Sequence, residues 1–132
     1  MRITREIEIE EKRAVALFDT GSMHTYVKKP LLTKISGWRI LKPYRVAIGG
    51  RSLEVREIYH VNGKIEGFDF DTEVVPIDEI GKINGQDIEV IIGALTMEKW
   101  EITVNPKDGT LDLSGLKRRE FTEFFEQDKI SK

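Results

Sequence analysis

The chain has 132 residues, the length of a single domain, and its 21 basic residues nearly balance its 23 acidic ones. It contains no cysteine, which excludes a disulfide framework, a thiolate zinc site and a cysteine nucleophile. The balanced charge argues against general nucleic-acid binding, and no apolar run is long enough to span a bilayer. We therefore expect a cytoplasmic protein that binds neither nucleic acid nor membrane.

The first third of the sequence predicts short strands. Ile7 and Ile9 alternate with glutamates, which is the period of a half-buried strand. Residues 14–18 form a continuous apolar run, typical of a strand that is buried on both faces. We expect a further strand at residues 23–27 and a short loop or helix from Pro30 to Ile35.

The middle of the sequence predicts two hairpins. Residues 44–48 and 51–55 flank Gly49-Gly50, the spacing of a tight primed turn. A second hairpin is expected around Asn62-Gly63, with strands at 57–61 and 63–66. A strand then continues over residues 68–75, and the polar residues 78–87 predict an exposed loop.

The last third predicts a buried strand, two helices and one more hairpin. Residues 89–92 form an apolar strand that ends at Gly93, and a short helix follows at 95–100. Residues 102–104 and 110–113 bracket a turn. From residue 116 to about 127 a helical period places four apolar residues on one side: Leu116, Phe121, Phe124 and Phe125. The fold class is therefore mostly β, with a short internal helix and a C-terminal helix.

One segment carries chemistry, because the apolar run 14–18 leads directly into Asp19-Thr20-Gly21-Ser22. Gly21 allows a sharp turn, and its amide and the Ser22 hydroxyl are placed to donate hydrogen bonds to Asp19. Thr20, pointing the other way, is placed to bond across an interface to its own copy. An Asp-Thr-Gly turn alone is weak evidence, since such turns are common in β-proteins.

The context makes the motif more specific. The order Leu17-Phe18-Asp19-Thr20-Gly21-Ser22, then a hairpin tipped by Gly49-Gly50, then Ile91-Ile92-Gly93-Ala94-Leu95, resembles the retropepsin-like aspartic proteases over about residues 14–113. The resemblance implies one domain over residues 1–132, a single-lobe acid-protease barrel that is homodimeric and has a C-terminal helical extension at about 115–128.

The resemblance also implies which residues form the site. Asp19 would be catalytic, supported by Thr20, Gly21 and Ser22. The hairpin at about 44–55 would be a flap that closes over the substrate. The residues expected to line the substrate are Ile48, Gly49, Gly50 and Arg51 of the flap, with Ile92 and Gly93 beside the site. No metal or cofactor is implied.

The mechanism follows from a count of the motif. A site of this kind needs two facing carboxylates, and Asp71-Thr72-Glu73 and Asp108-Gly109-Thr110 do not supply a second Asp-Thr-Gly. Two chains would therefore meet about a twofold axis, and the two Asp19 carboxyls would share a proton and activate a water. The expected activity is that of an endopeptidase acting on peptides or unfolded proteins.

Other interpretations remain open. The same fold can serve as a non-catalytic dimerisation or peptide-binding module, although an intact Asp-Thr-Gly-Ser favours the enzyme. A nucleic-acid-binding β-barrel is a more distant alternative. His24 and His60 have no third ligand pattern, so surface or packing roles are preferred to a zinc site. The loop 78–87 is longer than in compact viral proteases. The charged tail from Gly115 extends past the last family-like strand, which puts dimerisation through interleaved chain termini in doubt.

Overall fold

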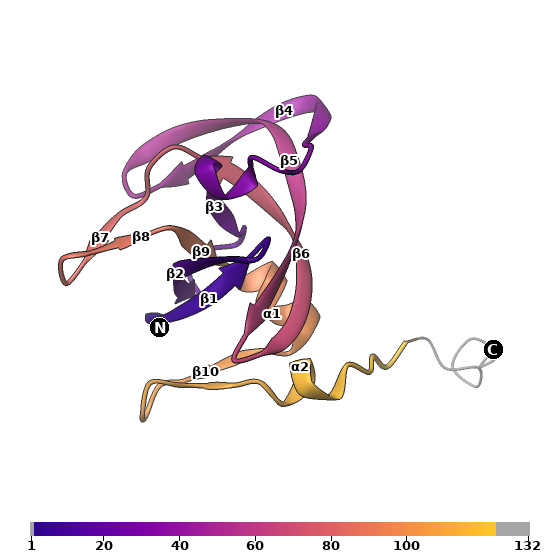
Figure 1. Ribbon diagram of the computed structural model, residues 1–132. Coiled ribbons are helices and arrows are strands. Elements are labelled where there is room, and N and C mark those ends of the chain that lie inside the picture. Colours follow the sequence, from indigo (N-terminus) through magenta and orange to yellow (C-terminus); the bar gives the residue numbers. More distant parts are fainter. Residues whose placement is uncertain (1, 124–132) are drawn as a thin grey trace, which may run out of the picture.

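The computed structural model describes residues 2–123, and in it seven strands form one curved sheet in the order β1-β2-β9-β3-β6-β5-β4. The strands are β1 Arg2–Ile9, β2 Lys12–Asp19, β3 Tyr26–Lys28, β4 Trp38–Ile48, β5 Arg51–Ile65, β6 Phe68–Ile77 and β9 Val90–Ile92. The far end of β1 also pairs with β5, so the sheet closes into a barrel, and β4 and β5 form a long hairpin at its top (Figure 1).

Two short hairpins and three helical segments complete the described chain. One hairpin joins β7 Gly81–Ile83 to β8 Gln86–Ile88, and the other joins β10 Thr103–Asn105 to β11 Thr110–Asp112. The helical segments are the 3₁₀ turn η1 Lys29–Leu32 and the α-helices α1 Ala94–Trp100 and α2 Ser114–Arg118. The predicted mostly-β class is confirmed. No helix within residues 2–123 is long and apolar enough to cross a membrane.

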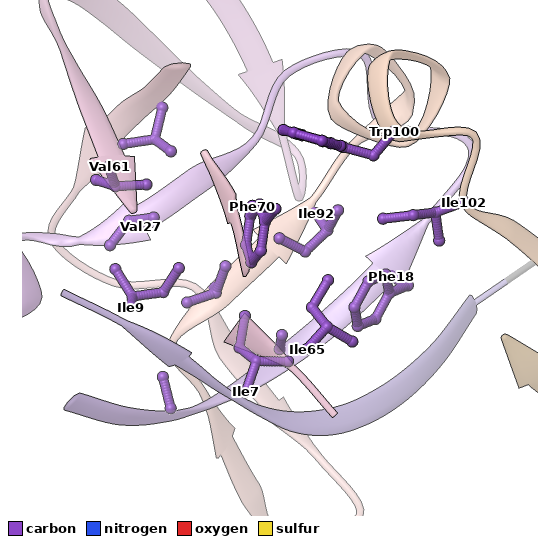
Figure 2. Close-up of a cluster of buried hydrophobic side chains, with 14 of the residues drawn as sticks. Ile7, Ile9, Phe18, Val27, Val61, Ile65, Phe70, Ile92, Trp100 and Ile102 are labelled. Atoms are coloured by element: carbon purple, nitrogen blue, oxygen red, sulfur yellow. The ribbon is translucent and has the colours of Figure 1, made fainter. Parts of the chain in front are cut away.

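The core consists of two clusters that lie on opposite faces of β2 and β9. Phe18 and Ile92 belong to the larger cluster, together with Phe70 and Trp100 (Figure 2). Leu17 and the neighbouring residue of β9 belong to the smaller cluster. Because successive side chains of a strand point to opposite faces, a strand that is buried on both sides needs a continuous apolar run. This explains the unbroken apolar sequences at 14–18 and 90–92.

The strand that was expected at residues 23–27 begins later, at Tyr26. Residues 22 and 23 do not join the sheet, because their carbonyls accept hydrogen bonds from the first amides of α1: Ala94 to Ser22 at 2.6 Å and Leu95 to Met23 at 3.1 Å. The segment between β2 and β3 is therefore a loop held against the start of a helix.

The prediction of a hairpin around Asn62-Gly63 is wrong, since β5 runs through both residues without a break. The turn to β6 lies at Glu66-Gly67, where both residues have positive φ, 51° and 83°. Gly63 serves a different purpose. A Cβ at this position would lie 2.6 Å from the carbonyl oxygen of Glu8 and 2.7 Å from the ring of Phe70. Glycine is needed because β1 crosses β5 here at close range.

Residues 78–87 are not a plain loop, because they contain most of the β7–β8 hairpin. Asn84 and Gly85 form its two-residue turn, with φ of 52° and 77°, as a primed turn requires. The hairpin is anchored by Ile88, which is buried in the smaller cluster, and Ile80 and Ile83 pack against the same cluster.

The C-terminal helix is shorter than expected. α2 ends at Arg118, Arg119 adopts a left-handed conformation with φ of 52°, and residues 120–123 are not helical. The guanidinium of Arg119 lies 5.0 Å from the centroid of the Trp100 ring, and the centroid of the Phe121 ring lies 5.4 Å from that of Trp100. The chain therefore turns over Trp100 instead of continuing the helix. Phe124 and Phe125 lie outside the described residues.

Candidate active site

Asp19 is the last residue of β2, where it pairs with Arg2 at the start of β1. β9 lies between β2 and β3, parallel to the first and antiparallel to the second. The loop 20–25 must therefore pass over the end of β9 to connect the two outer strands. Asp19 is half-buried where this loop begins.

The turn after Asp19 holds its carboxylate. The Gly21 amide donates a hydrogen bond to Asp19 Oδ1 at 2.9 Å, which confirms the predicted contact. The Ser22 amide donates to the main-chain oxygen of Asp19 at 3.1 Å and closes the turn. A Cβ on Gly21 would lie 3.3 Å from Asp19 Oδ1, so a larger residue would crowd the carboxylate that this turn positions.

The Ser22 hydroxyl does not contact Asp19, and this prediction is wrong. It donates instead to the carbonyl oxygen of His24 at 3.0 Å. Ser22 thus stabilises the loop beyond the turn. Thr20 is exposed on the turn itself.

Gly93 is the point where the loop and α1 meet. A Cβ there would lie 2.2 Å from the carbonyl oxygen of His24. The Gly93 amide donates to Thr25 Oγ1 at 3.0 Å. Gly93 is buried and allows the loop to pack closely on the start of α1.

A network of three buried threonines braces this region, and sequence reasoning missed it. The hydroxyl of Thr96 lies 2.6 Å from the hydroxyl of Thr25 and 2.6 Å from that of Thr72. The three side chains are 2–4% exposed and belong to the loop 20–25, α1 and β6. A buried network with every hydroxyl paired fixes the relative position of its elements. Its sequence signal was a threonine at an inward position of a strand, such as Thr72.

A groove of about 360 Å³ lies between the Asp19 turn and the β4–β5 hairpin. Its lining consists of Asp19, residues 21–24, Tyr26, residues 46–49 and Ile91. Gly49 and Gly50 form the expected primed turn at the hairpin tip, with φ of 57° and 75°. Residues 46–49 of the hairpin therefore form one wall of the groove that contains the carboxylate.

Only part of the predicted substrate-lining set reaches this groove. Ile48 and Gly49 line it, whereas Gly50 and Arg51 do not. The guanidinium of Arg51 instead donates to the carbonyl oxygen of Glu79 at 2.8 Å, outside the groove. Ile92 and Gly93, which were expected beside the site, do not line the groove. Ile91 lines it instead, since Ile92 points to the opposite face and is fully buried in the larger cluster.

Aromatic side chains surround His24 at one end of the groove. Its ring stacks on Tyr44 of β4, with centroids 5.9 Å apart, and meets the edge of Tyr26 at 6.3 Å. Burial is the main cause that raises the pKa of Tyr26, and the neighbouring Tyr44 raises it further. Burial is likewise the main cause that raises the pKa of Tyr44, and the charge of Glu73 raises it further. Both phenols therefore stay neutral and keep their hydroxyl protons at physiological pH.

His60, the second histidine, lies apart from the Asp19 turn. Its Nε2 is 2.7 Å from Asp71 Oδ2. Within residues 2–123 no cluster of three or more histidine, cysteine, aspartate or glutamate side chains is arranged to hold a metal ion.

No protein-family model and no curated protein matches the sequence, but many solved structures match the fold. The retroviral protease-like domain of Ddi1 from Leishmania major aligns with a TM-score of 0.56 and 15% identity, over 86% of this chain and 89% of that domain. The EIAV protease, solved with an inhibitor, aligns with a TM-score of 0.52 and 18% identity, over 80% of this chain and 93% of the protease.

A foamy viral protease-reverse transcriptase also aligns, with a TM-score of 0.55 and 15% identity, over 75% of this chain and 12% of the longer viral protein. At these identities the likeness concerns the fold. The closed barrel agrees with it, as do the Asp19 turn at the end of β2 and the hairpin that lines the groove. The chain therefore has the retropepsin-like fold, that of the single-lobe, retroviral-type aspartic proteases.

Proposed function

We propose that this protein is an aspartic endopeptidase that works as a homodimer, with one Asp19 from each chain. The observation that carries the proposal is the position of Asp19, whose carboxylate accepts a hydrogen bond from Gly21 and lies in a groove with one wall formed by a glycine-tipped hairpin. Among residues 2–123, Asp19 is the one acidic side chain that lines this groove. A second carboxylate for the reaction must then come from a second copy of the chain.

In the proposed dimer the two Asp19 carboxyls share one proton, because two like charges about 3 Å apart cannot both ionise cheaply. The ionised carboxylate takes a proton from a bound water, which attacks the carbonyl carbon of the peptide bond. The protonated carboxyl donates to the carbonyl oxygen, which gives a tetrahedral diol. The carboxyl that took the proton from water then returns it to the amide nitrogen, the C–N bond breaks, and a diol proton restores the shared proton of the pair. The Gly21 amide holds each carboxylate in place during this exchange. The titration steps belong to the pair and not to either chain.

The walls of the groove favour an extended peptide with apolar side chains next to the bond that is cut. Tyr26, Val46, Ile48 and Ile91 supply apolar surface around Asp19. The hairpin tip would have to move for a polypeptide to enter from the side, as a flap does. The proposed substrates are therefore peptides and unfolded proteins.

The test is incubation of the protein with reduced, alkylated casein over a range of pH, with and without pepstatin, followed by mass spectrometry. We expect cleavage that pepstatin inhibits and that Asp19→Asn abolishes, since the amide is near-isosteric but cannot serve as the base. The variant should elute as the same folded dimer. Cleavage by Asp19→Asn at the wild-type level would refute the assignment. Casein binding without cleavage would point to a peptide-binding module on the same fold.

A further inference from the structure

The groove at Asp19 is the first of three cavities that share lining residues. The second cavity, of about 320 Å³, shares His24 with the groove. The third, of about 510 Å³, shares His60 and Glu73 with the second. The first and third cavities are lined by opposite ends of β4, and the second lies between them on residues of β5, β6 and α1.

Polar groups surround the second cavity. His24, His60, Glu73 and Lys99 line it, and the buried threonines of the network are also part of its wall. His60 and Lys99 are both held by Asp71 Oδ2, at 2.7 and 3.4 Å. Such a surface offers hydrogen-bond donors and acceptors to the main chain of a peptide, and it does not demand one particular side chain.

The third cavity, which we call the Trp38 pocket, is apolar. Its lining is Trp38, Arg39, Ile40, Ile58, Tyr59, His60 and Glu73. Trp38 is 69% exposed, in contrast to Trp100, which is 3% exposed in the core. A tryptophan left open to solvent within a hollow of aliphatic and aromatic side chains is the pattern of a surface that binds an apolar group.

The Trp38 pocket is preformed on its far side. The Tyr59 ring lies so close to Gly37 that a Cβ there would be 2.8 Å from its Cζ. The Tyr59 hydroxyl donates to Glu57 at 3.0 Å, which fixes the ring from its other end. An incoming side chain would therefore meet a wall that is already in place where the Tyr59 ring lies against Gly37.

We propose that the Trp38 pocket is a distal subsite that binds an aromatic or large aliphatic side chain of a polypeptide substrate, an inference that rests on the proposed peptidase function. The occupant is a polypeptide because the pocket continues the groove at Asp19 through the shared lining of the second cavity. A peptide that runs extended alongside β4 advances about 3.3 Å per residue, as the strand does. Val46 lines the groove and pairs with Leu53, whereas Trp38 lines the pocket and pairs with Ile58. The register of β4 shifts between Arg39 and Tyr44, so the two positions are five β5 residues apart, and the bound side chain lies about five residues from the cut bond.

The test compares two peptides around a cleavage site that has first been mapped in alkylated casein. The short peptide has four residues on each side of the cut. The long peptide extends the short one by eight polar residues on each side. In a series of such peptides a single phenylalanine replaces one added residue, and it is moved from the fifth to the twelfth position, counted from the cut bond. We measure the preference for the long peptide as the ratio of its kcat/KM to that of the short peptide. This ratio should be largest with phenylalanine at about position five or six and should fall as the phenylalanine is moved further from the cut. Trp38→Ala should reduce this preference by roughly threefold to tenfold, the effect of losing one apolar contact.

Two variants serve as controls. Trp38→Phe retains an aromatic ring and should retain most of the preference. Leu41→Ala removes another exposed apolar side chain of β4, one that lines none of the three cavities, and should retain it fully. A preference that is the same in Trp38→Ala as in the wild type would overturn the inference, as would equal KM increases on both peptides.

A second measurement does not depend on cleavage. Because Trp38 is exposed and Trp100 is buried, binding at the pocket should shift the tryptophan emission of Asp19→Asn to shorter wavelength with the long peptide. The short peptide, and the long one without phenylalanine, should leave it unchanged. If casein is not cut and no site can be mapped, the same pair of peptides is built around a central Leu-Leu bond. An emission shift with the long peptide and no cleavage of either peptide would then leave the subsite standing while the peptidase proposal fails. If cleavage occurs without the shift, the subsite proposal fails alone.

Discussion

Gly63 shows how one residue can be fixed by a contact far away in the sequence. It lies within β5, two residues before the strand ends at Ile65. A glycine weakens a strand, and Asn-Gly is a typical turn pair. Its neighbours are the backbone of Glu8 and the ring of Phe70, both brought there by the closure of the barrel. The requirement for glycine is therefore set by packing between strands and not by a turn.

Gly63→Ala should consequently destabilise the protein by about 1–3 kcal/mol, the usual cost of forcing an extra group into a packed site. The measurement is urea unfolding of the variant and the wild type. Asn62→Ala, at the exposed neighbouring position, is the matched control and should change stability by less than about 0.5 kcal/mol. Equal stability of Gly63→Ala and the wild type would mean that β1 and β5 do not approach so closely.

For single residues, the sequence predicts a contact correctly where the two partners are close neighbours in the chain. The contact from the Gly21 amide to Asp19 spans two residues, and the turn alone dictates it. The Ser22 hydroxyl was assigned wrongly, because it bonds to the carbonyl of His24 once the loop packs on α1. Neither that packing nor the threonine network is visible in a pattern of neighbouring residues.

Among the elements, the β4–β5 hairpin has the clearest expected role, and its tip can be tested without disturbing the core. Replacing both Gly49 and Gly50 with valine should reduce activity far more than stability. Both residues have positive φ, which valine resists, whereas a Cβ added at either position would meet no atom within 4 Å. Activity on casein and the melting temperature are the two measurements. Parallel losses in both would identify the hairpin as ordinary scaffold.

The elements that the sequence predicted best are those with a strong pattern. Apolar runs located β2 and β9, and the glycine pair located the β4–β5 turn. The same primed-turn signal, Asn84-Gly85, was overlooked because the strands on either side of it are three residues long and mostly exposed. The tail helix was predicted too long because contacts of Arg119 and Phe121 with Trp100 redirect the chain after α2.

For the whole molecule, the central question is how one acidic side chain per groove becomes a pair. The described part of the tail does not resolve it, because residues 118–121 pack back onto their own barrel. Arg118 pairs with Glu101, and the guanidinium of Arg119 and the ring of Phe121 cover Trp100. The proposed dimer must therefore be tested through its activity and its mass, independently of any assumed interface.

Mixing active and inactive chains provides that test. If each site needs two Asp19 side chains, excess Asp19→Asn should poison the wild type, because mixed dimers contain a single competent carboxylate. With free exchange and unbiased pairing, activity should fall as the square of the wild-type fraction. Dilution of the wild type should also lower activity per chain along the dissociation curve measured by sedimentation. Subunit exchange must be demonstrated separately with labelled chains. A linear decline under exchanging conditions would mean that each chain acts alone, with a second acid outside the groove lining of residues 2–123.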